Sequence, residues 1–160
     1  ADFGIIFDTD VDRAGAVDKF GKEINRNRII ALIAAIAIGE HPGAAIVTDS
    51  ITSSGLQEFI ESDLGGVHHR FKRGYKNVIN EAIRLNQEGI FTPVAIETSG
   101  HGALKENYFL DDGAYLIAKI LIQMAKLKKE GKTIIITSHN HEDIEVLCDR
   151  VYEMDNGRLS

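Results

Sequence analysis

Three aspartates, Asp8, Asp10 and Asp12, occupy alternate positions of one short segment, and Arg13 follows directly. Like charges this close repel one another, so a loop that collects them is expected to hold a compensating cation. The few carboxylate ligands, with room for water or a phosphate oxygen, favour Mg²⁺ over Ca²⁺. The spacing therefore predicts a magnesium loop, with Arg13 balancing the carboxylates or donating to a phosphate. The plainer alternative is a solvated acidic turn.

Two other interpretations of the acidic loop are weaker. An EF-hand counted from Asp8 would need glycine and glutamate at positions that carry Arg13 and Lys19. A magnesium-dependent phosphatase would use Asp8 as nucleophile and Asp10 as acid, but the segments that follow are not those expected for such an enzyme.

A second candidate loop, "ETSGHG", begins at Glu97. Glu97 can accept two hydrogen bonds, Ser99 can donate and accept one, and the glycines allow the backbone to approach a ligand closely. These groups suit a polyhydroxylated substrate such as a sugar. His101 can carry a proton, although a turn histidine hydrogen-bonded to the backbone is an equally good interpretation.

A third loop gathers cations in an otherwise acidic chain. Arg70, Lys72, Arg73 and Lys76 surround Gly74. They indicate either an anion-binding rim or a solvated basic edge.

Composition limits the possible classes of protein. The chain has 160 residues, 44% hydrophobic and 26% charged, which is typical of a globular domain with a core of its own. Its net charge of −6 argues against a general nucleic-acid binder. Cys148 is the only cysteine, so neither a disulfide framework nor a cysteine-based zinc site is expected, and a cytoplasmic location fits. The most apolar run, residues 29–38, is too short to cross a membrane.

Apolar runs alternate with helical patterns along the whole chain. Strands are predicted at 3–7 (buried), 44–49, 66–71, 92–98 and 132–139. Helices are predicted from Asn25 or Asn27 to Gly39 and at 53–63, 75–89, 111–131 and 142–149. A hairpin is predicted at 15–24, and a closing strand or hairpin at 150–160. This order predicts a single α/β domain with a mainly parallel or mixed sheet and helices on both faces. The three polar loops are then expected at the carboxyl ends of strands, where ligands gather in such sheets.

In this order, the three loops resemble those of the alpha-D-phosphohexomutases, the phosphoglucomutase and phosphomannomutase family. "DTDVDR" is similar to that family's magnesium loop and "ETSGH" to its sugar-binding loop, and the resemblance runs from residue 1 to about 133. It implies the fold of the family's third domain, and phosphoryl transfer between C1 and C6 of a hexose phosphate through a phosphoserine.

The resemblance also implies roles for single residues. Asp8, Asp10 and Asp12 would hold Mg²⁺, and Arg13 would stand beside the phosphoserine. Glu97 and Ser99 would contact sugar hydroxyls, with His101 in the same loop. Tyr75 stands where many members carry a histidine near the substrate. With Arg73 and Lys76 of the basic loop, it is expected to line the substrate site.

The nucleophilic serine of that family is not recognisable here, since the only Ser-His pair is Ser138–His139, near the other end. The chain is therefore expected to combine the end of the second domain with the third, to bind hexose phosphate weakly if at all, and to be inactive alone.

The tail departs from this pattern. Residues 131–159 resemble the end of an ABC-transporter ATPase domain, with His139 as its switch histidine. Lys126 stands where the first glycine of a phosphate-binding loop would be required, so no ATP binding is expected. The chain is accordingly divided into a metal loop and hairpin at 1–24, a mutase-like part at 25–131, and a tail at 132–160 that completes the sheet. An engineered chimeric domain without activity of its own is the alternative.

Overall fold

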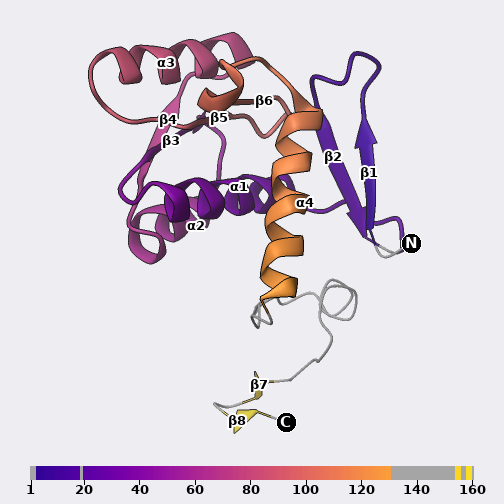
Figure 1. The fold of residues 1–160 in the computed structure, drawn as a ribbon. Helices are drawn as coiled ribbons and strands as arrows, with labels where there is room; N and C mark the ends of the chain where they lie inside the picture. The colour runs from indigo at the N-terminus through magenta and orange to yellow at the C-terminus, as the bar shows by residue number, and fades with distance from the viewer. Residues whose placement is uncertain (1–2, 19, 131–153, 156–157, 160) are drawn as a thin grey trace.

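The computed structural model describes residues 3–18, 20–130, 154–155 and 158–159 (Figure 1). The strand predicted at 132–139, the helix at 142–149 and the completion of the sheet by them lie outside the described residues. Met154–Asp155 (β7) pairs antiparallel with Arg158–Leu159 (β8), in agreement with a hairpin near the end of the chain. Within the described part of the chain, no helix combines the length and apolarity needed to span a membrane.

A four-stranded mixed sheet forms the centre of the fold, with the strand order β4-β3-β5-β6. The strands are β3 (Ala45–Asp49), β4 (Val67–Phe71), β5 (Val94–Ile96) and β6 (Gly102–Leu104). β3 pairs in parallel with both β4 and β5, and β6 runs antiparallel to β5. Every residue of β3 is buried, as expected for a central strand covered on both faces. The predicted mixed α/β sheet is confirmed, although β5 is shorter than expected and β6 was not predicted.

Helices cover both faces of this sheet (Figure 1). They are α1 (Arg26–Glu40), α2 (Ser54–Glu58) continued by a π-helical turn η1 (Phe59–Asp63), α3 (Tyr75–Gln87), a 3₁₀ turn η2 (Lys105–Asn107) and α4 (Gly113–Lys129). On one face, Ile33 of α1 and Leu116 of α4 belong to the same buried cluster as Ile46 of β3. On the other face, Val78 of α3 packs in a second cluster with Val47 of β3.

Side-chain caps begin two of the helices near the predicted positions. The Asn25 side chain accepts a hydrogen bond from the backbone N–H of Asn27 at the start of α1. The Ser53 side chain accepts one from Leu56 at the start of α2. Both are standard N-cap contacts, which satisfy helix donors that have no partner within the helix.

The acidic loop belongs to a separate two-stranded sheet. β1 (Phe3–Phe7) pairs antiparallel with β2 (Ala14–Asp18), so the aspartates lie in the turn of a hairpin. The strand predicted at 3–7 is confirmed as β1, but its predicted burial was wrong, because Ile6 and Phe7 are 56% and 39% exposed. The expectation that the aspartates follow a strand of the main parallel sheet was also wrong, because β1 pairs with β2 alone among the described strands. The hairpin predicted at 15–24 is reduced to a single bridge between Val17 and Glu23.

Candidate functional site

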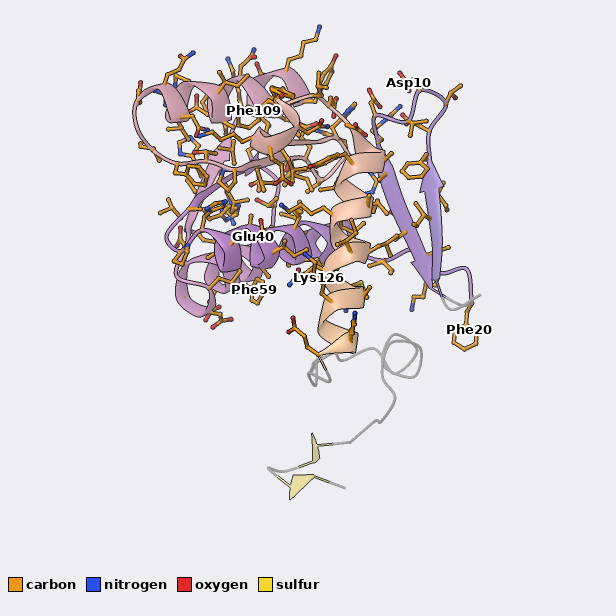
Figure 2. All side chains as sticks on the ribbon, in the orientation of Figure 1. Asp10, Phe20, Glu40, Phe59, Phe109 and Lys126 are labelled. Atoms are coloured by element: carbon orange, nitrogen blue, oxygen red, sulfur yellow. The ribbon has the colours of Figure 1, made fainter. Side chains whose placement is uncertain are left out.

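The acidic loop lies directly against the loop that carries Ser99 and His101. The backbone N–H of Ala14 donates to the carbonyl of Gly100 over 3.2 Å, and Arg13 forms an antiparallel bridge with His101. Figure 2 shows Asp10 at the tip of the β1–β2 hairpin, beside the beginning of α4. Two candidate loops that are far apart in sequence therefore lie in contact and make up one candidate site.

Two glycines permit this close approach. Gly100 has φ +105°, and a Cβ built on it would lie 3.0 Å from the Ala14 carbonyl oxygen. A Cβ on Gly113, the first residue of α4, would lie 2.7 Å from the Arg13 carbonyl carbon and 2.9 Å from the Ala14 nitrogen. Contacts this short with backbone atoms would force the chain to shift, so the segment at Arg13 fits between these loops because both positions lack a side chain.

Arg13 neutralises one of the three aspartates. Its backbone N–H donates to Asp8 Oδ1 over 3.2 Å and its Nε donates to Asp8 Oδ2 over 2.5 Å. Although desolvation opposes the change, these hydrogen bonds from Arg13 and its charge lower the pKa of Asp8. Asp8 is therefore held as a carboxylate, with the guanidinium beside the acidic loop.

Asp12 is in the opposite electrostatic situation. Its Oδ1 atom is buried and accepts no hydrogen bond from the described residues, and Arg13 Nε lies 3.7 Å from it. Desolvation raises the pKa of Asp12, and the charges of Asp10 and Asp8 raise it further, against the lowering effect of His101. A carboxylate oxygen that is buried without a donor is a suitable ligand for a cation.

The donor set fits a hard divalent cation. One oxygen from each of Asp8, Asp10 and Asp12 can be chosen so that all three lie within 4.8 Å of one another. Val11, between two of them, adopts φ +64°, which is costly for a β-branched residue, and the Gly113 N–H donates to its carbonyl over 3.2 Å. The backbone thus holds the carboxylates together despite their repulsion, as a metal-binding loop requires.

His101 connects the acidic loop with two further groups. Its Nδ1 lies 2.7 Å from Asp111 Oδ2 and 3.6 Å from Asp12 Oδ2. Its ring stacks on the ring of Tyr75, with centroids 4.5 Å apart and planes inclined by 17°. Asp111 also accepts a hydrogen bond from the Gly102 N–H, and burial raises its pKa. In the sequence, Asp111 marks only the start of a predicted helix, so no local pattern predicts this contact.

Glu97 is buried, and it holds the third loop in place. Its Oε1 accepts a 2.6 Å hydrogen bond from the Gly74 N–H, and its Oε2 accepts one of 2.8 Å from Ser99 Oγ. A carboxylate offers about four acceptor sites, so these two bonds leave capacity for sugar hydroxyls. The preceding strand end is fixed by Thr98, whose Oγ1 donates to the fully buried Asp49 over 2.5 Å.

The basic loop divides into two groups. Arg70 is used inside the fold, because its Nε donates to Thr52 Oγ1 and its Nη2 to the Ser53 carbonyl. Arg73 and Lys76 are exposed, and Lys76 Nζ lies 5.7 Å from the centroid of the Tyr75 ring. The cations that can face a ligand near Tyr75 are therefore fewer than the sequence indicated.

Comparison with known proteins matches this chain to phosphoglucomutases and phosphomannomutases. A family model described as phosphoglucomutase/phosphomannomutase, alpha/beta/alpha domain III, matches residues 25–139. A phosphomannomutase/phosphoglucomutase of Pseudomonas putida is 30% identical over 161 aligned residues, which cover 100% of this chain and 33% of the relative. A phosphoglucomutase of Neisseria gonorrhoeae is 35% identical over 122 residues, covering 76% of this chain and 25% of the relative.

Solved structures agree with this similarity. The crystal structure of a phosphoglucomutase/phosphomannomutase family protein from Burkholderia thailandensis superposes with a TM-score of 0.67 at 32% identity, over 85% of this chain and 30% of that one. A phosphomannomutase-like structure from Thermus thermophilus has a TM-score of 0.63 at 22% identity and supports the fold alone. The chain thus spans about a third or less of the length of these relatives.

Proposed function

The chain belongs to the phosphoglucomutase/phosphomannomutase family, in which it carries the alpha/beta/alpha domain III, and from this we propose that it supplies the metal-binding and sugar-binding loops of a phosphohexomutase. The reaction is transfer of a phosphoryl group between C1 and C6 of a hexose phosphate. The Mg²⁺ ligands are Asp8, Asp10 and Asp12, and the sugar-binding residues are Glu97, Ser99 and His101.

One observation carries this proposal, namely the contact between the acidic loop and the "ETSGH" loop. The Ala14 N–H donates to the Gly100 carbonyl, and His101 lies within 3.6 Å of Asp12. A phosphoryl-transfer site requires a cation next to the oxygens of the substrate. The acidic loop could not place a cation there if it lay apart from the loop that binds the sugar.

Each group has a defined task in this account. Bound Mg²⁺ offsets charge on the phosphoryl group during transfer. Arg13, which donates through Nε to Asp8, places a guanidinium where it can also face a phosphate. Glu97 and Ser99 accept hydrogen bonds from sugar hydroxyls, because the Ser99 hydroxyl proton is already donated to Glu97. The Glu97–Gly74 bond fixes the loop that presents Tyr75. Arg73, Tyr75 and Lys76 form the rim on the substrate side.

His101 is the group best placed to move a proton at this site. Its Nδ1 pairs with Asp111, which orients the ring, and Tyr75 covers one of its faces. The other ring nitrogen, Nε2, is then the atom that can exchange a proton with a sugar hydroxyl.

By itself the chain is expected to bind ligands without turnover, because covalent transfer needs a phosphoserine carrier. The proposal is tested by measuring amide chemical shifts of the full chain with Mg²⁺, with glucose 1-phosphate, and with both. Saturable shifts at Ser99 and His101 that strengthen with Mg²⁺ support it. Shifts that avoid both loops contradict it. Conversion to glucose 6-phosphate, free of host enzyme, contradicts the prediction of inactivity.

A further inference from the structure

The carboxylate of Asp49 is fully buried at the carboxyl end of β3. Both hydrogen bonds that it accepts from the described residues come from Thr98. The Thr98 hydroxyl donates to Oδ2 over 2.5 Å, and the Thr98 N–H donates to Oδ1 over 3.4 Å. Burial of a carboxylate is costly unless hydrogen bonds compensate for it. The folded chain is therefore stabilised when Thr98 stays beside Asp49.

Thr98 belongs to the tight turn that carries the proposed sugar-binding groups. Hydrogen bonds within the turn close it, since the Glu97 N–H donates to the His101 carbonyl over 2.9 Å and the Gly100 N–H donates to the Glu97 carbonyl over 3.1 Å. These bonds shape the turn but do not set its direction relative to the sheet. The His101 side of the turn is tied to the acidic loop, whereas the Thr98 side is tied to β3. The contact with β3 therefore orients the half of the turn that begins at Glu97.

Every polar group of Thr98 is used to hold this half of the turn. Its hydroxyl and its N–H donate to Asp49, and its carbonyl accepts a hydrogen bond of 3.0 Å from Arg26 Nη1 at the start of α1. With Thr98 directed into the fold, its two neighbours meet each other, and Ser99 Oγ donates to Glu97 Oε2 over 2.8 Å. Glu97 and Ser99 are the residues to which the proposed function assigns the sugar hydroxyls.

We propose that Asp49 is a positioning residue, which acts through Thr98 to hold the turn at 97–101 in the orientation that presents Glu97 and Ser99. Stability alone does not require such a pair, because apolar groups of the same shape can replace both partners of a buried hydrogen bond at little cost. A directional bond is needed where a turn must keep one orientation. That the presented groups meet a sugar rests on the proposed function, whereas the hold of Asp49 on the turn does not.

The test measures amide hydrogen exchange in the full chain without ligand, relative to the amides of β3. Thr98→Val keeps the volume but removes the hydroxyl that donates to Asp49. The N–H groups of Thr98 and Gly74, which both donate to carboxylates, should then exchange about tenfold faster, as expected for loss of one charge-assisted hydrogen bond. Thr98→Ser keeps the hydroxyl and should exchange as wild type does. Thr92→Val is the matched control, because it removes a fully buried hydroxyl that donates to the Ile90 carbonyl, and it should leave both amides unchanged.

Asp49→Asn tests the carboxylate itself, because it keeps the shape of the side chain and removes the charge. It should accelerate exchange at Thr98 and Gly74 as Thr98→Val does. The double variant Asp49→Asn/Thr98→Val should exchange no faster at Gly74 than the more affected single variant, since both substitutions remove the same hydrogen bond. Fully additive effects of the two substitutions would show that Asp49 does not act through Thr98, and would overturn the proposal.

Titration with glucose 1-phosphate in the presence of Mg²⁺, followed by amide chemical shifts, connects the orientation of the turn with ligand binding. Thr98→Val should raise the Kd about tenfold, whereas Thr98→Ser and Thr92→Val should bind as wild type does. Absence of binding by wild type would count against the proposed function and leave the exchange rates to decide the role of Asp49. Equal exchange in Thr98→Val and Thr92→Val would overturn the positioning proposal. So would faster exchange in Thr98→Val without any loss of affinity, in a wild type that binds the sugar phosphate.

Discussion

The ring of Tyr75 stacks on the imidazole of His101, with centroids 4.5 Å apart and planes inclined by 17°. This contact joins the start of α3 to the loop between β5 and β6, two segments that meet only in the folded chain. It fixes one face of the imidazole, and the Asp111 carboxylate fixes its Nδ1 edge.

Replacing Tyr75 with alanine should release the imidazole of His101. The ring protons of His101 should move downfield because the ring current of Tyr75 is lost. The free energy of unfolding should fall by at least about 0.5–1.5 kcal/mol, which is the contribution of an aromatic pair beyond the burial of its rings. Tyr75→Phe keeps the ring and should change neither quantity much. Histidine resonances that are identical in wild type and Tyr75→Ala would show that the stack does not form in solution.

Gly113 is expected to tolerate no side chain. A Cβ there would lie 2.7 Å from the Arg13 carbonyl carbon, so Gly113→Ala must displace the backbone beside the acidic loop. We expect a loss of about 1–3 kcal/mol in the free energy of unfolding, typical of overpacking, together with weaker Mg²⁺ binding.

Gly39 provides the matched control, since it lies in α1 and a Cβ added to it would meet no heavy atom within 4 Å. Gly39→Ala should raise stability by about 0.5–1 kcal/mol, because alanine has less freedom to lose in a helix. Chemical denaturation of both variants measures the difference. Equal effects of the two substitutions would contradict the close approach at Gly113.

Much of the main sheet could be predicted from local sequence patterns. The geometry of the candidate site could not, because it is made by tertiary contacts that no local pattern encodes. The N-caps at Asn25 and Ser53 and the buried run of β3 carry their signals within a few residues. The pairing of β1 with β2 was missed because the turn between them contains no glycine and is made by Val11 in a left-handed conformation. The partnership of Asp111 with His101 was missed because the two residues meet across β6, in tertiary structure.

His68 is expected to make the protein less stable in acid. Burial, followed by the charges of Arg70 and His69 and against that of Glu61, lowers the pKa of His68 from 6.5 to about 4. Its Nε2 lies 2.7 Å from Thr48 Oγ1, and its Nδ1 is buried without a partner among the described residues. The folded state therefore favours the neutral ring.

The sign of the effect follows from this preference. His68 binds a proton near pH 6.5 in the unfolded chain but only near pH 4 in the folded chain. Its contribution to the free energy of unfolding is therefore fully present above pH 6.5 and is lost as the pH falls to 4. The pKa difference corresponds to at most about 3 kcal/mol.

Denaturant titrations of wild type, His68→Gln and the exposed His41→Gln, between pH 7 and pH 4, measure this contribution. The free energy of unfolding should fall less steeply between pH 7 and pH 4 in His68→Gln than in wild type, and His41→Gln should behave as wild type does. An unchanged slope in that variant would show that His68 is already protonated or solvated in the folded protein.

The central claim is that Asp8, Asp10 and Asp12 hold one Mg²⁺, and thermal melting across a Mg²⁺ titration at fixed ionic strength tests it most directly. The Tm of wild type should rise with Mg²⁺, by an amount equivalent to about 2.7 kcal/mol when the free ion reaches a hundred times its Kd. Asp10→Asn keeps the shape but removes a ligand charge, so it should abolish most of this rise. Without metal it should melt slightly higher than wild type, since Asp10 contributes to the raised pKa of Asp12. Asp63→Asn, the same change at an exposed position of η1, should respond to Mg²⁺ as wild type does. Identical responses of wild type and Asp10→Asn would contradict the claim and leave the aspartates as a solvated acidic turn.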